Sequence, residues 1–335
     1  MRNIFKIKAV AASLLAFALA ACSLLEKDGT TPNLPTPTQI AQAVSPTNMP
    51  QLTPATQLAV DTGTLSASSP TSSIQPSLVP VIPSPSAPAV MYSEGQYAVI
   101  KVKEGDVLNV RQSPGTPNAV LETLPPHATG LTLTGKMSQI GGENWVEIKR
   151  LTGGTGWVNA AYLTEYHPAS SFCGDGQVTA LLEAFKTAIL NKNGEQLAAL
   201  VSPLHGVTVQ YLRSGKTATY TSDKALWLFT STYQMDWGVQ PGSGLELKGS
   251  FHEEVLPKLV DVLGSSYTFA CNNPQTGGAS YTYHWPFEYG NMNFYSLYRP
   301  GKAGDEQNWR TWLVGIEYTN NKPYLFLLVH LFWEP

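Results

Sequence analysis

The stretch 145–163, WVEIKRLTGGTGWVNAAYL, sets the fold of the middle of the chain. Polar Glu147 stands between apolar Val146 and Ile148, two glycines follow at Gly153 and Gly154, and a second short apolar stretch begins at Gly156. Alternation with a period of two is typical of a half-buried strand, and paired glycines are typical of a tight turn. The stretch therefore predicts two short strands joined by a turn.

Similar short alternations precede this stretch. They lie at 97–100, 108–111, 120–121 and 131–133, with turns rich in Gly, Pro and Ser between them. Several short strands so close together predict a small all-β domain, a barrel or sandwich, over residues 92–167.

The ordered anchors of this region resemble the bacterial SH3-like (SH3b) domain. They are Leu108-Asn109-Val110-Arg111, Ser113-Pro114-Gly115, Leu124-Pro125-Pro126, Leu131, Trp145-Val146-Glu147-Ile148, Gly156-Trp157-Val158 and Tyr162-Leu163. That family is associated with recognition of peptides or peptidoglycan outside the cytoplasm. The resemblance therefore implies binding of cell-wall peptide, with Asn109, Arg111, Trp157 and Tyr162 as candidate ligand-binding residues.

The same positions also belong to the family's scaffold. Arg111 can pair with a backbone carbonyl or with Glu147 instead of a ligand. A ligand groove and a spacer or domain-docking module therefore both stay open.

The first 21 residues have the composition of an export signal. Basic residues precede an apolar run over 9–21 that is too short to span a membrane as a mature helix. The run ends in Leu19-Ala20-Ala21-Cys22, which resembles the bacterial lipoprotein lipobox. The resemblance implies that 1–21 is a signal peptide and that a lipid on Cys22 anchors an extracytoplasmic protein to the cell membrane, or to an outer membrane where there is one. A plain secretory signal, with Cys22 incidental, is the alternative.

Residues 22–91 have the composition of a linker. Asp61 is the only charged residue between Gly29 and Ser93, and prolines alternate with Ser, Thr, Ala and Gln. Such a segment cannot bury enough apolar surface to offset the entropy lost on ordering. It predicts a disordered Pro/Ser/Thr-rich tether.

Residues 172–335 change from helical to strand patterns along the chain. An apolar stripe from Val178 to Ile189 predicts a helix that ends at Asn193-Gly194. Leu197, Leu200 and Val201 predict a second, short helix that ends at Ser202-Pro203. A capping box, Ser250 with Glu253, predicts a further helix over 250–263 that Pro257 kinks or splits and Gly264 ends. Strands are expected at 207–209, 217–221, 245–247, 267–269, 281–287, 294–299, 309–319 and 323–333, with Asn320-Asn321 as a hairpin turn.

This order predicts an α+β domain in which N-terminal helices cover a curved antiparallel sheet. It resembles the NTF2-like or cystatin-like superfold, and more narrowly a C-terminal domain of secreted bacterial proteins that carry SH3-like modules. The segments that carry the resemblance are 197–206, 237–238, 249–251, 312–316 and 328–330. The superfold hosts many functions and assigns none by itself.

Two cysteines, Cys173 and Cys271, lie in this last region. Two cysteines in an oxidising compartment favour a disulfide. The alternative is a catalytic cysteine, because SH3-like domains accompany cell-wall cysteine peptidases of the NlpC/P60 type. Cys173 lacks the Asp before it and the Ser after it that this family needs, so we expect no such activity.

Five aromatic residues recur at every second position from Tyr281 to Tyr289, which places them on one side of the expected strand. Either they form a core face under the helix at 178–190, or they line a cavity for a sugar or an apolar ligand. In the second case Trp285, Glu288, Arg299, Arg310 and His330 are the candidate ligand-binding residues. His330 lies at an alternate position with Phe326, Leu328 and Phe332, so the four would share one face of the expected strand. This predicts that His330 points inward.

Composition and motifs exclude several functions. The formal charge of -3 does not fit nucleic-acid binding. No zinc-binding pair of histidines, P-loop or dinucleotide motif occurs, so no metal or cofactor is expected. We therefore predict a lipid-anchored binding or scaffolding protein of the cell envelope without catalysis. The alternative is a cell-wall-directed enzyme that uses a cavity in the C-terminal domain.

Overall fold

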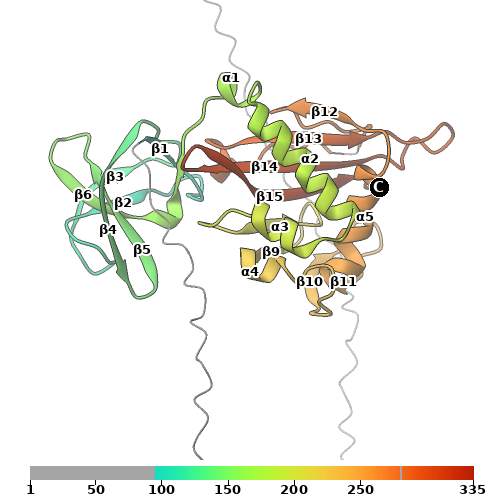
Figure 1. Ribbon diagram of the computed structural model, residues 1–335, viewed down its shortest axis with the longest axis horizontal. Helices are drawn as coiled ribbons and strands as arrows, with labels where there is room; N and C mark the ends of the chain where they lie inside the picture. The colour runs from blue at the N-terminus through green and yellow to red at the C-terminus, as the bar shows by residue number, and fades with distance from the viewer. Residues whose placement is uncertain (1–94, 280) are drawn as a thin grey trace, which may run out of the picture. The chain divides into compact units, whose positions relative to one another are not determined.

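The computed structural model describes residues 95–279 and 281–335 (Figure 1). The expected signal, Cys22 and the tether lie outside these residues. The described chain is strand-rich with few helices, and all of it falls within one compact unit, Val81–Pro335. Among the described helices, none has the length and apolar character needed to cross a membrane.

The first part of the fold is a seven-stranded sheet. Its strands are β1 (Gln96–Val99), β2 (Leu108–Arg111), β3 (Val120–Leu124), β4 (Leu131–Ile140), β5 (Glu143–Lys149), β6 (Thr155–Asn159) and β7 (Leu163–Glu165), with a 3-10 turn η1 (Ala160–Tyr162) before the last. The order in the sheet is β3-β2-β6-β5-β4-β1-β7. The two strands predicted around the glycine turn are β5 and β6, which pair antiparallel.

The first and last strands of this sheet are neighbours. β1 pairs antiparallel with β7, with Tyr97 opposite Glu165. The amide of Tyr166 also donates to the carbonyl of Gln96 (2.8 Å). The chain therefore enters and leaves the sheet at one place.

The second part of the fold combines helices with a six-stranded sheet. The helices are α1 (Ala169–Phe172), α2 (Gly176–Leu190), α3 (Gly194–Leu200), α4 (Ser222–Ala225), a π-helical turn η2 (Phe251–Val255), α5 (Leu256–Leu263) and a 3-10 turn η3 (Phe287–Tyr289). The strands are β8 (Val207–Gln210), β9 (Thr217–Tyr220), β12 (Thr268–Cys271), β13 (Asn293–Arg299), β14 (Arg310–Thr319) and β15 (Lys322–Phe332). Their order is β12-β13-β14-β15-β8-β9, and β10 (Met235–Val239) pairs with β11 (Glu246–Gly249) separately.

We expected a wholly antiparallel sheet. This prediction is wrong for one strand pair, because β8 runs parallel to β15. β8 follows α3 instead of a hairpin, so no tight turn fixes its direction. The other pairs in this sheet are antiparallel.

The predicted helical stripe forms α2. Its apolar residues are buried, and the Asp175 side chain accepts a hydrogen bond from the amide of Gln177 at the N-terminus. The helix stops at Leu190, before the expected end at Asn193-Gly194. Asn193 instead begins α3, because its side chain accepts a hydrogen bond from the amide of Gln196.

The capping box at Ser250 and Glu253 is confirmed, with both reciprocal hydrogen bonds present. The helix it opens starts as the π-helical turn η2 and continues as α5, with Pro257 in the first turn of α5. Pro257 fits there because an amide in the first turn of a helix needs no partner within it. Gly264 ends the helix as predicted.

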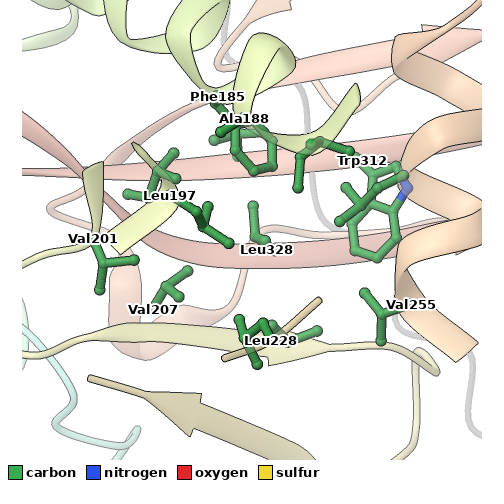
Figure 2. Close-up of a cluster of buried hydrophobic side chains, with 14 of the residues drawn as sticks. Phe185, Ala188, Leu197, Val201, Val207, Leu228, Val255, Trp312 and Leu328 are labelled. Carbon is green, nitrogen blue, oxygen red and sulfur yellow. The ribbon is translucent and has the colours of Figure 1, made fainter. Parts of the chain in front are cut away.

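Helices α2 and α3 lie over one face of the six-stranded sheet (Figure 1). Phe185 and Leu197 from the helices pack with Val207, Trp312 and Leu328 from the strands (Figure 2). Trp312 is fully buried, and its indole donates to the carbonyl of Lys258 (3.1 Å). This cluster is the main core of the second part.

The aromatic run from Tyr281 to Phe287 forms no strand, so that prediction is wrong. Pro286 has no amide to donate to a ladder, and the chain turns at η3 directly after it. The aromatic side chains pack with Phe294 and Phe326 in a cluster separate from the one that α2 contacts. They therefore cover the opposite face of the sheet, and the expected cover by the helix is also wrong.

A bulge in the last hairpin changes which residues share a face. Gly315 pairs with Leu327 and Ile316 with Leu325, so Phe326 is the extra residue of β15. Phe326 consequently lies on the face opposite Leu328. The prediction that His330 and Phe326 share one face of the strand is therefore wrong.

The turn between β14 and β15 is the one predicted at Asn320-Asn321. The φ angles are 54° and 58°. Positive φ at both central residues is the requirement of a two-residue hairpin turn that suits the twist of the strands. Asparagine tolerates this conformation better than most residues.

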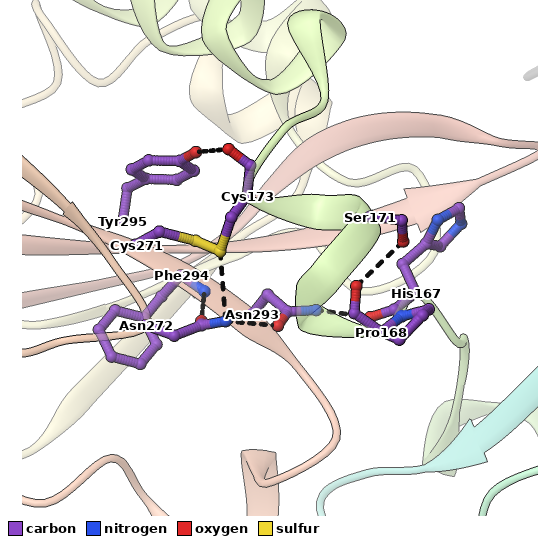
Figure 3. The surroundings of a disulfide bond; sticks show 9 residues. All are labelled: His167, Pro168, Ser171, Cys173, Cys271, Asn272, Asn293, Phe294 and Tyr295. Atoms are coloured by element: carbon purple, nitrogen blue, oxygen red, sulfur yellow. Dashed lines mark hydrogen bonds between the residues drawn. A yellow bond between two sulfur atoms is a disulfide. The ribbon is translucent and has the colours of Figure 1, made fainter.

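Cys173 and Cys271 form the predicted disulfide (Figure 3). It joins the segment between α1 and α2 to the end of β12. The Tyr295 hydroxyl donates to the carbonyl of Cys173 (2.9 Å), and beside the bond the Asn272 amide donates to the side chain of Asn293 (2.7 Å). The bond thus fastens the start of the helical layer to an edge of the sheet.

Candidate functional site

A groove of about 480 Å³ opens on the seven-stranded sheet. Asn109, Arg111 and Tyr162 line it, whereas Trp157, the fourth residue predicted from the sequence, is not among the lining residues. The others are Lys101, Val102, Lys103, Asp106, Val107, Leu108, Thr116, Glu143, Trp145 and Asn159. The structure therefore brings three of the four predicted residues together.

Local structure explains how these side chains reach the groove. In β2, Leu108 and Val110 are buried, and the alternating positions of Asn109 and Arg111 are half-buried. Tyr162 ends the 3-10 turn that follows β6, and Asn159 caps this turn by accepting from the amide of Ala161 (2.9 Å). Tyr162 is 38% exposed, so its ring can contact a ligand.

Arg111 pairs with a backbone carbonyl and not with Glu147. Its Nη1 donates to the carbonyl of Asn118 (2.7 Å), and the Asn118 side chain donates to the carbonyl of Pro114 (2.7 Å). Arg111 therefore supports the loop between β2 and β3. A guanidinium has five donors, so this single bond leaves donors for a ligand.

Glu147 has other partners in the sheet. Its carboxylate accepts from the Thr134 hydroxyl (2.7 Å), from Lys136 and from Thr155. These hydrogen bonds, with Thr134 first, lower the pKa of Glu147 below its ordinary value. The residue holds β4, β5 and β6 together.

Trp145 is a site residue that sequence reasoning treated only as a strand anchor. It is 2% exposed and lines the groove, and its indole nitrogen has no hydrogen-bond partner within the described chain. A buried N–H without a partner costs about 1–3 kcal/mol. No signal in the sequence distinguishes this indole from a satisfied one.

Both signs of charge line the groove. Lys101, Lys103 and Arg111 are basic, and Asp106 and Glu143 are acidic. Burial lowers the pKa of Lys101, while nearby Glu317 opposes that shift. Such a lining suits a ligand that carries both carboxylate and ammonium groups.

The five residues proposed for a C-terminal cavity do not all meet at one place. Arg299 and Arg310 both bind the Asp261 carboxylate, at 3.0 and 2.7 Å. Trp285 stacks on Phe294 with ring centres 4.1 Å apart. The backbone carbonyl of Glu288 accepts from the amide of Lys101 (2.7 Å). Their contacts are those of packing and bracing.

His330, the fifth of these residues, is fully buried between aromatic rings. It stacks on Tyr211 and Trp312, and its Nδ1 donates to the carbonyl of Tyr211 (3.2 Å). Burial, helped by the charge of Arg310, lowers the pKa of His330 to about 3. The imidazole is therefore neutral at pH 7.

A buried polar cluster of Ser202, His205 and Glu317 was not predicted. His205 Nδ1 lies 2.6 Å from one carboxylate oxygen of Glu317, and the Ser202 hydroxyl donates to the other. The hydroxyl also accepts from the amides of Leu204 and His205. Serine here bonds the carboxylate and not the imidazole, so the cluster closes the 202–206 loop and lacks the order of a catalytic triad.

The seven-stranded sheet also contacts the second part of the chain. The Glu165 carboxylate accepts from the amides of Asn320 (2.6 Å) and Asn321 (2.8 Å), at the tip of the last hairpin. His127 donates to the carbonyl of Phe287 (2.7 Å), and Asn291 donates to the carbonyl of Val99 (2.9 Å). Docking, one of the alternatives left open by the sequence, thus uses residues other than Asn109, Arg111 and Tyr162.

A family model for the bacterial SH3 domain matches residues 106–164. The match includes β2 to β6 and most of the groove lining. No curated protein and no solved structure matches the chain. A bacterial SH3 domain is therefore present in this part of the chain, and it fits a role in binding cell-wall peptide.

Proposed function

We propose that the chain is a lipid-anchored, extracytoplasmic binding or scaffolding protein of the cell envelope. Its SH3 domain binds cell-wall peptide in the groove around Asn109. The observation that carries the proposal is the meeting of Asn109, Arg111 and Tyr162 in one groove inside the matched range.

The chemistry of the groove suits a peptide. The Asn109 side-chain amide both donates and accepts hydrogen bonds, as a peptide unit does. Lys103 and Arg111 can bind carboxylates, and Asp106 and Glu143 can bind an amine. The Tyr162 ring supplies apolar contact at little entropic cost.

The second part of the chain is proposed to be an NTF2-like α+β domain without catalytic activity. Support comes from the helices α2 and α3 over one face of a sheet that ends in a long hairpin. In this role the domain holds the SH3 domain through the Glu165 and His127 contacts. The lipid on Cys22 and the segment 22–91 would connect both to the membrane.

Replacing Tyr162 by alanine is expected to weaken binding to purified cell wall by about tenfold, the effect of losing an aromatic residue that contributes about 1.4 kcal/mol to binding. Because the side chain is partly exposed, the melting temperature should change by only a few degrees. Co-sedimentation with cell wall measures the binding, and calorimetry measures the melting. Leu151→Ala, in the exposed turn between β5 and β6, is the matched control. Equal binding by Tyr162→Ala and the unaltered protein would contradict the proposed groove.

Replacing Cys22 by serine is expected to release the protein from membranes. A thioether-linked lipid needs the sulfur atom, and serine does not supply it. Fractionation of cells after a high-salt wash measures the result. A variant that still sediments with membranes would show that Cys22 is not the anchor.

A further inference from the structure

A second groove, of about 730 Å³, lies beside β9. All four residues of β9, from Thr217 to Tyr220, line it. Successive residues of a strand point to opposite faces of the sheet. A cavity that touches every residue of one strand therefore follows the edge of that strand and not one face.

β9 is an open edge. It ends the strand order of the six-stranded sheet, and its partner is β8 alone. Among the residues 95–279 and 281–335, no other main-chain hydrogen bond reaches Thr217–Tyr220. In an antiparallel pair, every second residue of the outer strand directs its N–H and C=O away from the partner. The groove thus contains main-chain donors and acceptors at strand spacing.

The rest of the groove lining is rich in aromatic residues. Trp227 and Tyr233 are 65% and 72% exposed, the most exposed aromatic side chains in the described chain. Phe251 and Leu228 line the groove as well and are buried, and Lys224 is the one charged residue of the described lining. Burial, and then the neighbouring Tyr233, raise the pKa of Tyr220 to about 12, which agrees with a close grouping of these rings.

We propose that this groove binds an extended peptide segment of a partner protein, which adds to β9 as a further strand. Open main-chain groups at strand spacing are the recognition elements of an extended chain. The two faces of β9 differ, because Ala218 and Tyr220 pack against the core and Thr217 and Thr219 are exposed. The matching peptide alternates apolar with polar side chains and carries one acidic group for Lys224. The proposal does not depend on ligand binding by the SH3 domain.

The test uses the full chain with Cys22→Ser, so that no lipid is attached. The probe is an N-acetylated octapeptide in which phenylalanine or valine alternates with threonine, ended by a glutamate. Calorimetric titration is expected to give one saturable site. Trp227→Ala should weaken the binding about tenfold or more. Phe269→Ala, on the opposite edge strand β12, should leave it unchanged. Tyr233→Ala is a second variant on the groove wall, with the same expected loss.

A second peptide separates strand addition from simple apolar contact. N-methylation of every second residue of the peptide removes the N–H donors that face β9 in one register and keeps the side chains. Methylation at the intervening positions tests the register in which the other N–H donors face β9. Loss of binding in one of the two methylated peptides is the expected result. Equal binding by both would overturn strand addition, as would no binding of the parent peptide. If chitotetraose binds instead of the peptide and Trp227→Ala abolishes that binding, the groove is a saccharide site. If the chain dimerises and Trp227→Ala abolishes the dimer, the groove binds a second copy of the chain.

Discussion

Replacing Cys173 and Cys271 together by serine is expected to lower the free energy of unfolding by about 4 kcal/mol. The bond closes a loop of 98 residues in sequence separation, and a cross-link of that span removes much of the freedom of the unfolded chain. Urea titration of both proteins measures the difference. The native fold should persist, because Trp312, Phe185 and Leu328 keep their packing without the bond.

Reduction of the unaltered protein supplies the control for this prediction. A reductant should shift its unfolding transition to that of the serine variant, and should not shift the variant. If the two proteins unfold at the same urea concentration without reductant, the cross-link contributes nothing and the prediction is wrong.

Lowering the pH from 7 to 5 is expected to remove about 2 kcal/mol of stability through His330 alone. The unfolded residue takes up a proton near pH 6.5, and burial lowers the pKa of the folded residue to about 3. Between these values the unfolded state binds more protons, so stability falls as the pH falls. The contribution is complete above pH 6.5 and is lost progressively toward pH 3.

His330→Phe tests the origin of this pH dependence. Phenylalanine keeps the aromatic packing against Tyr211 and Trp312 and does not titrate. The variant is less stable at pH 7, because the carbonyl of Tyr211 loses its hydrogen bond, but its loss between pH 7 and 5 should be about 2 kcal/mol smaller. An unchanged pH dependence would show that His330 is protonated in the folded state.

Features that depend on neighbours in sequence could be predicted from the sequence. The capping box at Ser250, the buried stripe of α2 and the turn at Asn320 are each set by a few adjacent residues. The disulfide was predicted from the expected oxidising compartment and from the even number of cysteines in the last region. These features need no knowledge of what packs against them.

Features set by distant contacts could not be predicted. The extra residue at Phe326 moves its side chain to the other face, and no local pattern marks that position. The aromatic run alternates as a strand would, yet Pro286 and the contact with Phe294 give it an irregular path. The direction of β8 depends on the sheet it joins.

The groove was predictable only in part. Family motifs pointed to Asn109, Arg111 and Tyr162, because these positions recur with the motif. Glu143 and Lys101 line the groove as well, but Glu143 begins β5 and Lys101 lies in the loop after β1, and neither belongs to a motif. Their approach depends on how β5 and the loop after β1 are placed beside β2.

The pairing of β1 with β7 has a mechanical consequence. Tension between the chain before Gln96 and the chain after Glu165 acts on both strands from the same end. Such a load opens the hydrogen bonds of that pair one after another, beginning with the bond from Tyr166 to Gln96, and does not pass through β2, β3 or β6. The strand that carries Asn109 and Arg111 therefore lies outside the path of a load applied between these two chain segments, and its groove can keep its shape while that load is borne.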